Sequence, residues 1–200
     1  MATNLDSLIF DIDIDDLTDL QELYEATEGQ LIAAYNRSLT RTAVTLKKLG
    51  GQLIRDEVKA RNLKAIRRRL QQYKIKSRGL SELKLWFGLN DLPVSALKGR
   101  MSSSGNDATF AAASSGVGTQ RFTGGFVGNV RGRKSIYSRI GKERFPVKEA
   151  AVSIKHLQEA IEDDVFDQLP DIFMKYLESD LKGRVKQGMT NSYYEKKYGL

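Results

Sequence analysis

The chain of 200 residues contains no cysteine and one histidine, His156. Without cysteine, the protein has no disulfide, no thiolate catalysis and no cysteine-ligated zinc. A single histidine cannot assemble a histidine-ligated zinc site or a histidine-based catalytic triad. No apolar run approaches the roughly 20 residues that a membrane-spanning helix needs. The N-terminus is acidic where a secretory signal would be basic and then apolar. These absences predict a soluble protein with no membrane contact that is not exported by the usual route.

Basic residues are missing from the first 28 positions, and the charge of the whole chain is sorted by position. Residues 1–28 carry nine acidic side chains, residues 29–150 carry 25 Lys/Arg against 7 Asp/Glu, and residues 151–200 carry 7 against 9. The segment charges of −9, +18 and −2 make up the net charge of +7. So basic a middle segment attracts a polyanion, either nucleic acid or an acidic protein surface. The acidic flanks could be that surface, on the same chain or on the next copy.

Apolar periodicity predicts two main helices, one early in the chain and one near its end. The first covers residues 28–60, where Gly50 and Gly51 predict a kink or close packing against another backbone. The second covers residues 168–185, with Pro170 in its first turn. Shorter helices are expected at residues 15–27, 62–73 and 156–165.

Strand-like stretches occupy much of the remaining sequence. The order of helices and strands predicts an α+β fold, with the long N-terminal helix and the C-terminal helix packed on a small, mostly antiparallel sheet. The expected strands are residues 7–14, 74–76, 83–89, 134–140 and 145–154, with a turn at 141–144.

Residues 99–132 differ in composition from the rest of the chain. They hold eight of the seventeen glycines, several serines and few apolar side chains. This composition predicts a mobile loop or hairpin outside the core, which would become ordered on assembly. The chain then divides into an acidic N-terminal arm at 1–28, an α+β domain at 29–187 and a Tyr-rich tail at 188–200.

No pattern of catalytic or metal-binding residues is complete. Acidic residues occupy the spacing of a calcium-binding EF-hand loop, but Asp16 stands where the loop needs glycine, so a solvated acidic arm is expected instead. The pair Asp163 and Asp164 is expected on a solvated helix face. No glycine pattern is typical of phosphate binding. The sequence therefore predicts a protein that is not an enzyme and has no cofactor or metal. The EF-hand spacing comprises Asp11, Asp13, Asp15, Asp19 and Glu22.

Two basic clusters are the strongest candidates for a functional surface. For the first, the nearest acids are Glu57 and Glu82, so local ion pairs cannot neutralise it, although a solvated helix face remains an alternative. No base-reading motif accompanies either cluster, so contact with DNA would involve phosphates and carry little sequence information. The first cluster is Arg67, Arg68 and Arg69; the second is Arg131, Arg133, Lys134, Arg139, Lys142 and Arg144.

Two short motifs resemble a known family. Within residues 34–43, Asn36 and Arg37 belong to a stretch similar to the Ala-x-Asn-Arg…Ala signature that opens lambda-type minor tail protein Z. A Lys/Arg-rich segment, residues 58–69, follows as in that family. Residues 139–147 resemble the family's Gly-Lys-x-Arg-aromatic-Pro-apolar turn, and the resemblance covers roughly residues 29–187. The matching turn residues are Gly141, Lys142, Arg144, Phe145 and Pro146.

The resemblance implies a tail-completion protein, a structural component of the virion of a tailed bacteriophage. Such proteins act at the head-proximal end of the tail, in head–tail joining near the DNA channel. The first expected partner is the chain itself, in a ring that the six-fold symmetry of tails suggests is hexameric. The other expected partners are the tail tube or tail terminator, head-completion or neck proteins, and the DNA end. Assembly would take place in the host cytoplasm.

Two other functions stay open. The runner-up is a freestanding nucleic-acid-binding protein, which would bind DNA as a monomer in a salt-sensitive way. The third is a metal-dependent nuclease that uses the N-terminal aspartates, whose activity would vanish with a chelator.

Overall fold

The computed structural model describes residues 8–9, 14–61, 64–75 and 80–198. The protein has the α+β fold that the sequence predicts, with long helices near both ends and small antiparallel sheets. Its residues form two compact units. The described residues of unit 1 fall within Leu49–Gln71 and Phe87–Asp163, and those of unit 2 within Asp6–Lys48, Gln72–Trp86 and Asp164–Leu200.

Helix α2 is the longest element, and it contributes residues to both units. It begins at a capping box, in which the backbone N–H of Gln30 donates to Oγ1 of Thr27 at 3.3 Å. In return, the backbone N–H of Thr27 donates to Oε1 of Gln30 at 2.8 Å. These two bonds satisfy donors that a helix start otherwise leaves open, so the sequence fixes this boundary locally. The bounds of α2 are Glu28–Val58, close to the predicted 28–60.

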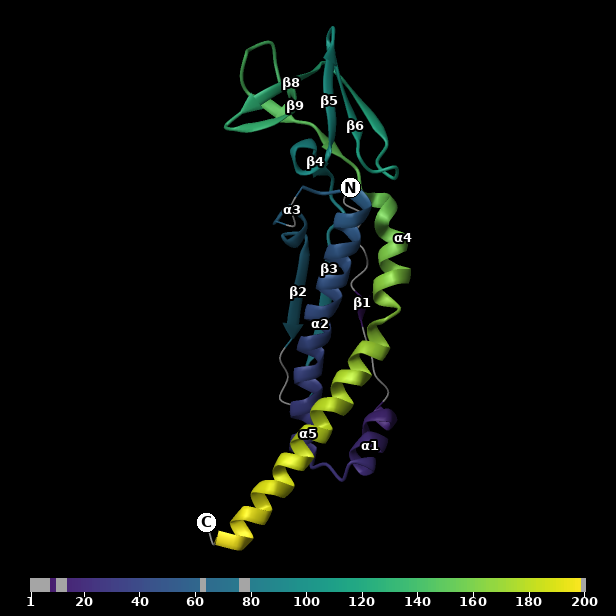
Figure 1. Cartoon of the computed structure of the whole chain (residues 1–200), viewed down its shortest axis with the longest axis vertical. Helices are drawn as coiled ribbons and strands as arrows, with labels where there is room; N and C mark the ends of the chain where they lie inside the picture. The colour runs from purple at the N-terminus through teal and green to yellow at the C-terminus, as the bar shows by residue number, and fades with distance from the viewer. Residues whose placement is uncertain (1–7, 10–13, 62–63, 76–79, 199–200) are drawn as a thin grey trace. The chain divides into compact units, whose positions relative to one another are not determined.

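Unit 2 is built on antiparallel packing between the first part of α2 and α5 (Leu169–Tyr198). The rings of Tyr35 and Phe173 meet edge to face, with centroids 5.4 Å apart. Further along, the hydroxyls of Thr45 and Tyr176 are 2.9 Å apart, and the Arg41 guanidinium lies 4.1 Å from the Tyr176 ring centroid. Figure 1 shows α5 running beside this part of α2. The shared core includes the buried residues Leu31, Leu39, Leu46, Leu177 and Leu181.

The remaining elements of unit 2 are a short helix and a small sheet. Helix α1 buries Leu17 and Leu20, so residues 14–23 of the acidic arm fold as part of the unit. The prediction of a wholly solvated arm is therefore wrong for this stretch, because the leucines outweigh the neighbouring acids as packing groups. The elements are α1 (Ile14–Leu23) and a sheet in the order β1 (Leu8–Ile9), β3 (Glu82–Phe87) and β2 (Leu70–Ile75). The first two residues of β2 and the last residue of β3 belong to unit 1.

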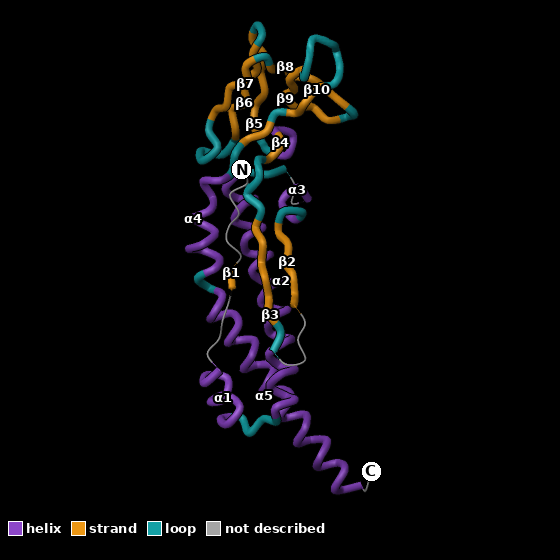
Figure 2. Tube along the Cα trace, turned by 180° about the vertical axis from the view of Figure 1, so that it is seen from behind, coloured by secondary structure: helices purple, strands orange, loops and turns teal. Residues whose placement is uncertain are grey.

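Unit 1 contains two three-stranded antiparallel sheets. Figure 2 shows their strands in orange. The first has the order β5 (Gly99–Ser104), β6 (Asp107–Ala112) and β7 (Thr119–Thr123). The second has the order β10 (Val147–Glu149), β9 (Arg133–Arg139) and β8 (Gly125–Val130).

Short elements complete unit 1. They are α3 (Lys64–Arg67), a two-stranded sheet of β4 (Leu92–Pro93) and β11 (Ala151–Val152), and the 3-10 helices η1 (Val94–Ala96) and η2 (Lys155–Leu157). Helix α4 (Gln158–Ile161) continues into the π-helical turn η3 (Glu162–Phe166), whose last residues belong to unit 2.

Residues 99–132 are not a long loop. They form β5 to β8, which agrees with the hairpin alternative, but the expectation that the segment lies outside the core is wrong, since Phe110 and Val117 are buried. The backbone ladder supports these strands, while Ala108 and Phe110 alternate inward along β6 and are fully buried. Glycine, serine and alanine hide this alternation in the sequence, because they add little apolar contrast between the two faces. Whether the segment is mobile before assembly stays a prediction.

Three other local predictions need correction. The basic helix expected at 62–73 is reduced to α3. The chain already enters strand β2 at Leu70, whose side chain is buried. Residues 62–63 lie outside the described structure. The strand expected at 145–154 is split into β10 and β11. The Tyr-rich tail at 188–200, predicted as a segment separate from the domain, is continuous with it, because α5 extends to Tyr198. An existing helix extends at little cost even without an apolar period.

Gly50 allows close packing within unit 1, against a side chain rather than another backbone. Helix α2 runs through both glycines without interruption. A Cβ atom at Gly50 would collide with the Phe87 ring, and one at Gly51 would come within 3.3 Å of Cδ1 of Leu70. No helix in the described part of the chain is long and apolar enough to cross a membrane.

Candidate nucleic-acid or partner interface

The first basic cluster has one structural arginine and two exposed ones. Arg69 donates through Nη1 to the carbonyl of Ala65 at 2.8 Å and through Nη2 to the carbonyl of Asp91 at 2.7 Å. Its Nε donates to the carbonyl of Asn90 at 3.3 Å. Burial lowers the pKa of Arg69, and the nearby charge of Asp91 opposes that shift. Arg69 therefore ties the α3–β2 turn to the segment before β4, and Arg67 and Arg68 alone present charge to solvent.

The second basic cluster begins at the β8–β9 hairpin. Val130 pairs with Arg133, which leaves Arg131 and Gly132 as a two-residue turn. Both turn residues have positive φ, 51° at Arg131 and 76° at Gly132, as a type I′ turn requires. The turn holds the exposed side chains of Arg131, Arg133 and Lys134 together at one end of the sheet. We refer to these three residues as the hairpin cations.

The opposite end of β9 carries the other half of the cluster. Val147 pairs with Arg139, and the backbone N–H of Ile140 donates to the carbonyl of Pro146 at 3.1 Å. The loop between these residues therefore has a closed base. Within this loop, the guanidinium of Arg144 lies 5.9 Å from the centroid of the Phe145 ring. We call Arg139, Ile140, Lys142, Arg144 and Phe145 the apolar–basic tip.

The sequence grouped the six cations of the second cluster, but the structure divides them. Arg133 and Arg139 are the first and last residues of β9. At about 3.3 Å per residue, their backbones are roughly 20 Å apart. Among the described residues, none of the six makes an ion pair. The sheet β8–β10 thus offers two separate sets of unneutralised cations, three at each end.

The β9–β10 turn neither requires its glycine nor buries its aromatic side chain. Gly141 of the family motif has no positive φ, and a Cβ there would meet nothing within 4 Å, so this turn has no backbone need for glycine. Phe145 of the same motif is 58% exposed. The turn therefore presents its aromatic side chain outward instead of inserting it into the core.

A half-buried carboxylate, that of Glu149, supports the sheet that carries the exposed cations. Oε1 of Glu149 accepts from the Ser135 hydroxyl at 2.7 Å and from the backbone N–H of Ser95 at 3.1 Å. The Tyr137 hydroxyl donates to the carbonyl of Arg133 at 2.9 Å. Burial, with the charge of Glu149, raises the pKa of Tyr137. These bonds hold β9 in register with its surroundings.

A hollow of about 410 Å³ lies beside this carboxylate in unit 1. Its wall carries both signs of charge, from Asp91, Arg121, Lys148 and Glu149. Arg121 also binds Asp107 through Nε, at 2.9 Å from Oδ2. The mixed charge gives the hollow no preference for a cation or an anion.

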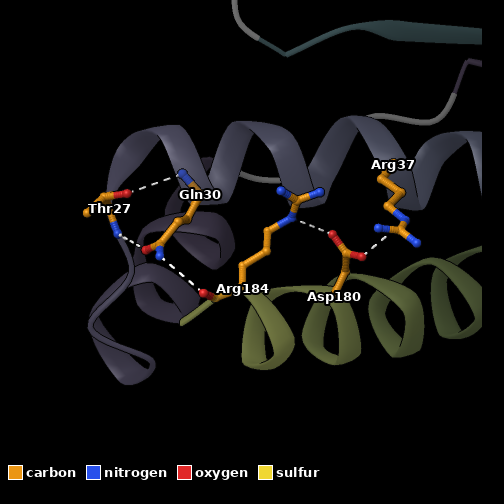
Figure 3. A network of polar contacts seen from close by, with 5 residues as sticks. All are labelled: Thr27, Gln30, Arg37, Asp180 and Arg184. Atoms are coloured by element: carbon orange, nitrogen blue, oxygen red, sulfur yellow. Dashed lines mark hydrogen bonds and ion pairs between the residues drawn. The ribbon is translucent and has the colours of Figure 1, made fainter. Parts of the chain in front are cut away.

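The family-motif residues of α2 have structural contacts in unit 2. Oδ1 of Asn36 accepts from the backbone N–H of Ser81 at 3.1 Å. Arg37 pairs with Asp180 of α5, with Nε 3.3 Å from Oδ1. Arg184, one turn beyond Asp180, approaches its Oδ2 at 2.6 Å. Figure 3 shows Asp180 between the two arginines and Gln30 bonded to the Arg184 carbonyl. The i, i+4 spacing of Asp180 and Arg184 was the available sequence signal for this network.

The acidic and histidine candidates form no site among the described residues. No group of three His, Cys, Asp or Glu side chains that could hold a metal is found there. Asp11 and Asp13 of the EF-hand spacing lie outside the described structure. His156, Asp163 and Asp164 are exposed.

Comparison with known proteins finds no match among protein-family models, curated proteins or solved structures.

Proposed function

We propose that this chain is a structural protein of a tailed-phage virion that completes the head-proximal end of the tail and takes part in head–tail joining. The observation that carries the proposal is the pair of unneutralised cation sets on the sheet β8–β10. A particle component placed around a DNA channel needs positive charge toward the DNA or toward acidic neighbours. The Asn36–Arg37 and Gly141–Pro146 motifs link that charge pattern to the minor tail protein Z family.

The hairpin cations are suited to phosphate contact. A type I′ turn fixes their backbone, and the side chains of Arg131, Arg133 and Lys134 are exposed without an ion-pair partner in the described structure. Contacts of this kind follow the DNA backbone and do not read its sequence. They would allow a passing DNA end to be guided without being held at one site.

The decisive test uses particles. The protein should be present in purified phage particles, and a strain that lacks it should accumulate heads and tails that do not join. A complementing variant with Arg131, Arg133 and Lys134 changed to glutamine should be incorporated but join poorly. The matched control removes three exposed cations of unit 1 elsewhere, Lys98, Arg100 and Lys155, and should join normally. Absence of the protein from particles would overturn the proposal.

The second candidate, a freestanding nucleic-acid-binding protein, is favoured by the same exposed cations. The two functions differ in what the isolated chain does. A freestanding binder stays monomeric and binds duplex DNA with an affinity that falls steeply with salt, in proportion to the phosphates contacted. A tail component self-associates and enters particles.

A further inference from the structure

Large apolar side chains of the apolar–basic tip are exposed. Ile140 is 66% and Phe145 58% exposed, although most side chains of this kind in the described structure are buried. Two cations, Lys142 and Arg144, and one acid, Glu143, lie within the same loop, and Arg139 precedes it as the last residue of β9. The hydrogen bond from the backbone N–H of Ile140 to the carbonyl of Pro146 closes the base of the loop. An ordered apolar surface with a basic rim is typical of a protein contact.

The end of α1 in unit 2 has the complementary composition. Leu23 is 71% exposed, while Leu17 and Leu20 of the same helix are buried. The neighbouring acids Asp19, Glu22 and Glu25 are exposed, and no basic residue occurs anywhere in residues 1–28. We call Asp19, Glu22, Leu23 and Glu25 the apolar–acidic end.

The apolar–acidic end is also held in place by its backbone. The N–H of Glu25 donates to the carbonyl of Glu22 at 3.1 Å, and the N–H of Ala26 donates to the carbonyl of Gln21 at 2.9 Å. These bonds close the C-terminus of α1, and the buried Leu17 and Leu20 anchor its other face. A partner would therefore meet a preformed surface, which lowers the entropic cost of binding.

We propose that the apolar–basic tip of one copy docks on the apolar–acidic end of α1 in a second copy. Each surface joins an exposed apolar centre to charges of one predominant sign, and the two signs are opposite. Two tips repel each other, and so do two α1 ends, so the contact is head to tail. Repeated head-to-tail contacts close a ring when the rotation between copies permits it. The proposal rests on the self-association that the proposed function includes.

The test reverses the charge of each surface in the full-length chain. The tip variant combines Lys142→Glu with Arg144→Glu, and the α1 variant combines Asp19→Lys with Glu22→Lys. In sedimentation velocity, each variant alone should self-associate more weakly than wild type, on the order of tenfold or more, because every contact becomes like-charged. An equimolar mixture should recover association, since each reversed tip then meets a reversed α1 end. A hexamer accommodates this alternation because six is even.

The control variant, Lys98→Glu with Arg100→Glu, changes the net charge by the same amount as the tip variant at other exposed positions of unit 1. It should associate like wild type, and circular dichroism should show all three variants folded. Docking is overturned if the control is weakened as much as the tip variant, if the tip variant associates normally, or if the mixture fails to recover.

Particle composition separates this proposal from the proposed function. If the wild-type protein enters particles but the mixed charge-reversed variants fail to recover association, the proposed function stands and the docking proposal is overturned. If the protein is absent from particles but the mixed charge-reversed variants recover association, the docking proposal stands and the proposed function is overturned.

Discussion

At the scale of single residues, the number of basic side chains in a sequence segment is larger than the number that the folded chain leaves free to bind a partner. Arg69 belongs to the run of three consecutive arginines, yet its guanidinium donates hydrogen bonds to three backbone carbonyls. Arg37 was part of a family motif, and its contact is an ion pair with Asp180, whose side chain is 8% exposed. Arg131 and Lys134, in contrast, stay exposed. Residue type identified the candidates, and the contacts of each side chain decide which ones remain available.

Gly50 gives the first prediction at this scale. The change Gly50→Ala should lower the free energy of unfolding by about 1–3 kcal/mol, because the new Cβ would overlap the Phe87 ring. Gly183→Ala is the matched control in α5, where nothing lies within 4 Å, and it should raise stability by about 0.5–1 kcal/mol. Chemical denaturation measures both. Adding Phe87→Leu to Gly50→Ala should recover part of the loss; equal stability of Gly50→Ala and wild type would contradict this packing.

Asp107 gives a pH prediction. Its hydrogen bond with Arg121, together with the backbone N–H of Gly124 and the Arg121 charge, lowers the pKa of the Asp107 carboxyl. Because the folded value lies below the unfolded value of about 3.9, the pair stabilises the protein fully above that pH. The contribution is lost as the pH falls through the folded pKa. In an NMR titration, Arg121→Gln should raise the pKa of Asp107, while Arg100→Gln should leave it unchanged. No rise in Arg121→Gln would contradict the assignment of cause.

At the scale of elements, amphipathic helices agree best with the sequence. The predicted helix at 28–60 is α2, and the predicted strand at 134–140 is β9, displaced by one residue. These elements carry strong periodicity or local boundary signals, such as the Thr27 capping box. The strands at 99–130 were predicted only as a loop or hairpin, because backbone pairing, not an apolar pattern, defines most of them. Helix α1 was identified, but its role as part of the core of unit 2 was not.

The burial of α1 leads to a prediction with an internal control. Leu17→Ala should lower the free energy of unfolding by about 2–5 kcal/mol, since this side chain is buried. Leu23→Ala makes the same chemical change on the same helix at an exposed position, and its effect should stay within about 0.5 kcal/mol. Thermal or urea denaturation compares the two. Equal effects would mean that α1 is not packed in solution.

At the scale of the whole molecule, the sorted charge is the leading property. The acidic residues 1–28 and the basic segment 29–150 are separated along the chain and carry net charges of −9 and +18. An exposed ion pair contributes only about 0–1 kcal/mol, so a single contact between copies would be weak. Repetition around a ring adds such contacts together while keeping them sensitive to salt.

We therefore expect self-association to weaken as salt increases. Between 0.1 M and 1 M NaCl the screening length falls from about 10 Å to about 3 Å, so wild-type oligomers should dissociate progressively in sedimentation experiments. The variant Asp19→Asn with Glu22→Asn, which keeps the buried face of α1, should show a flatter dependence on salt. An identical salt dependence in both proteins would show that these acids do not contribute to assembly.

The sequence by itself determined the α+β class, the two long helices, which segments of the chain are rich in cations, and the resemblance on which the proposed function depends. These properties are local: periodicity, capping and charge can be read from neighbouring residues. The tertiary structure alone decided that carbonyls near residue 90 bind Arg69, that β9 separates the hairpin cations from the apolar–basic tip, and that Phe145 points outward. Each of these depends on where distant segments of the chain meet, and that is set by packing and strand register, which no local pattern in the sequence encodes.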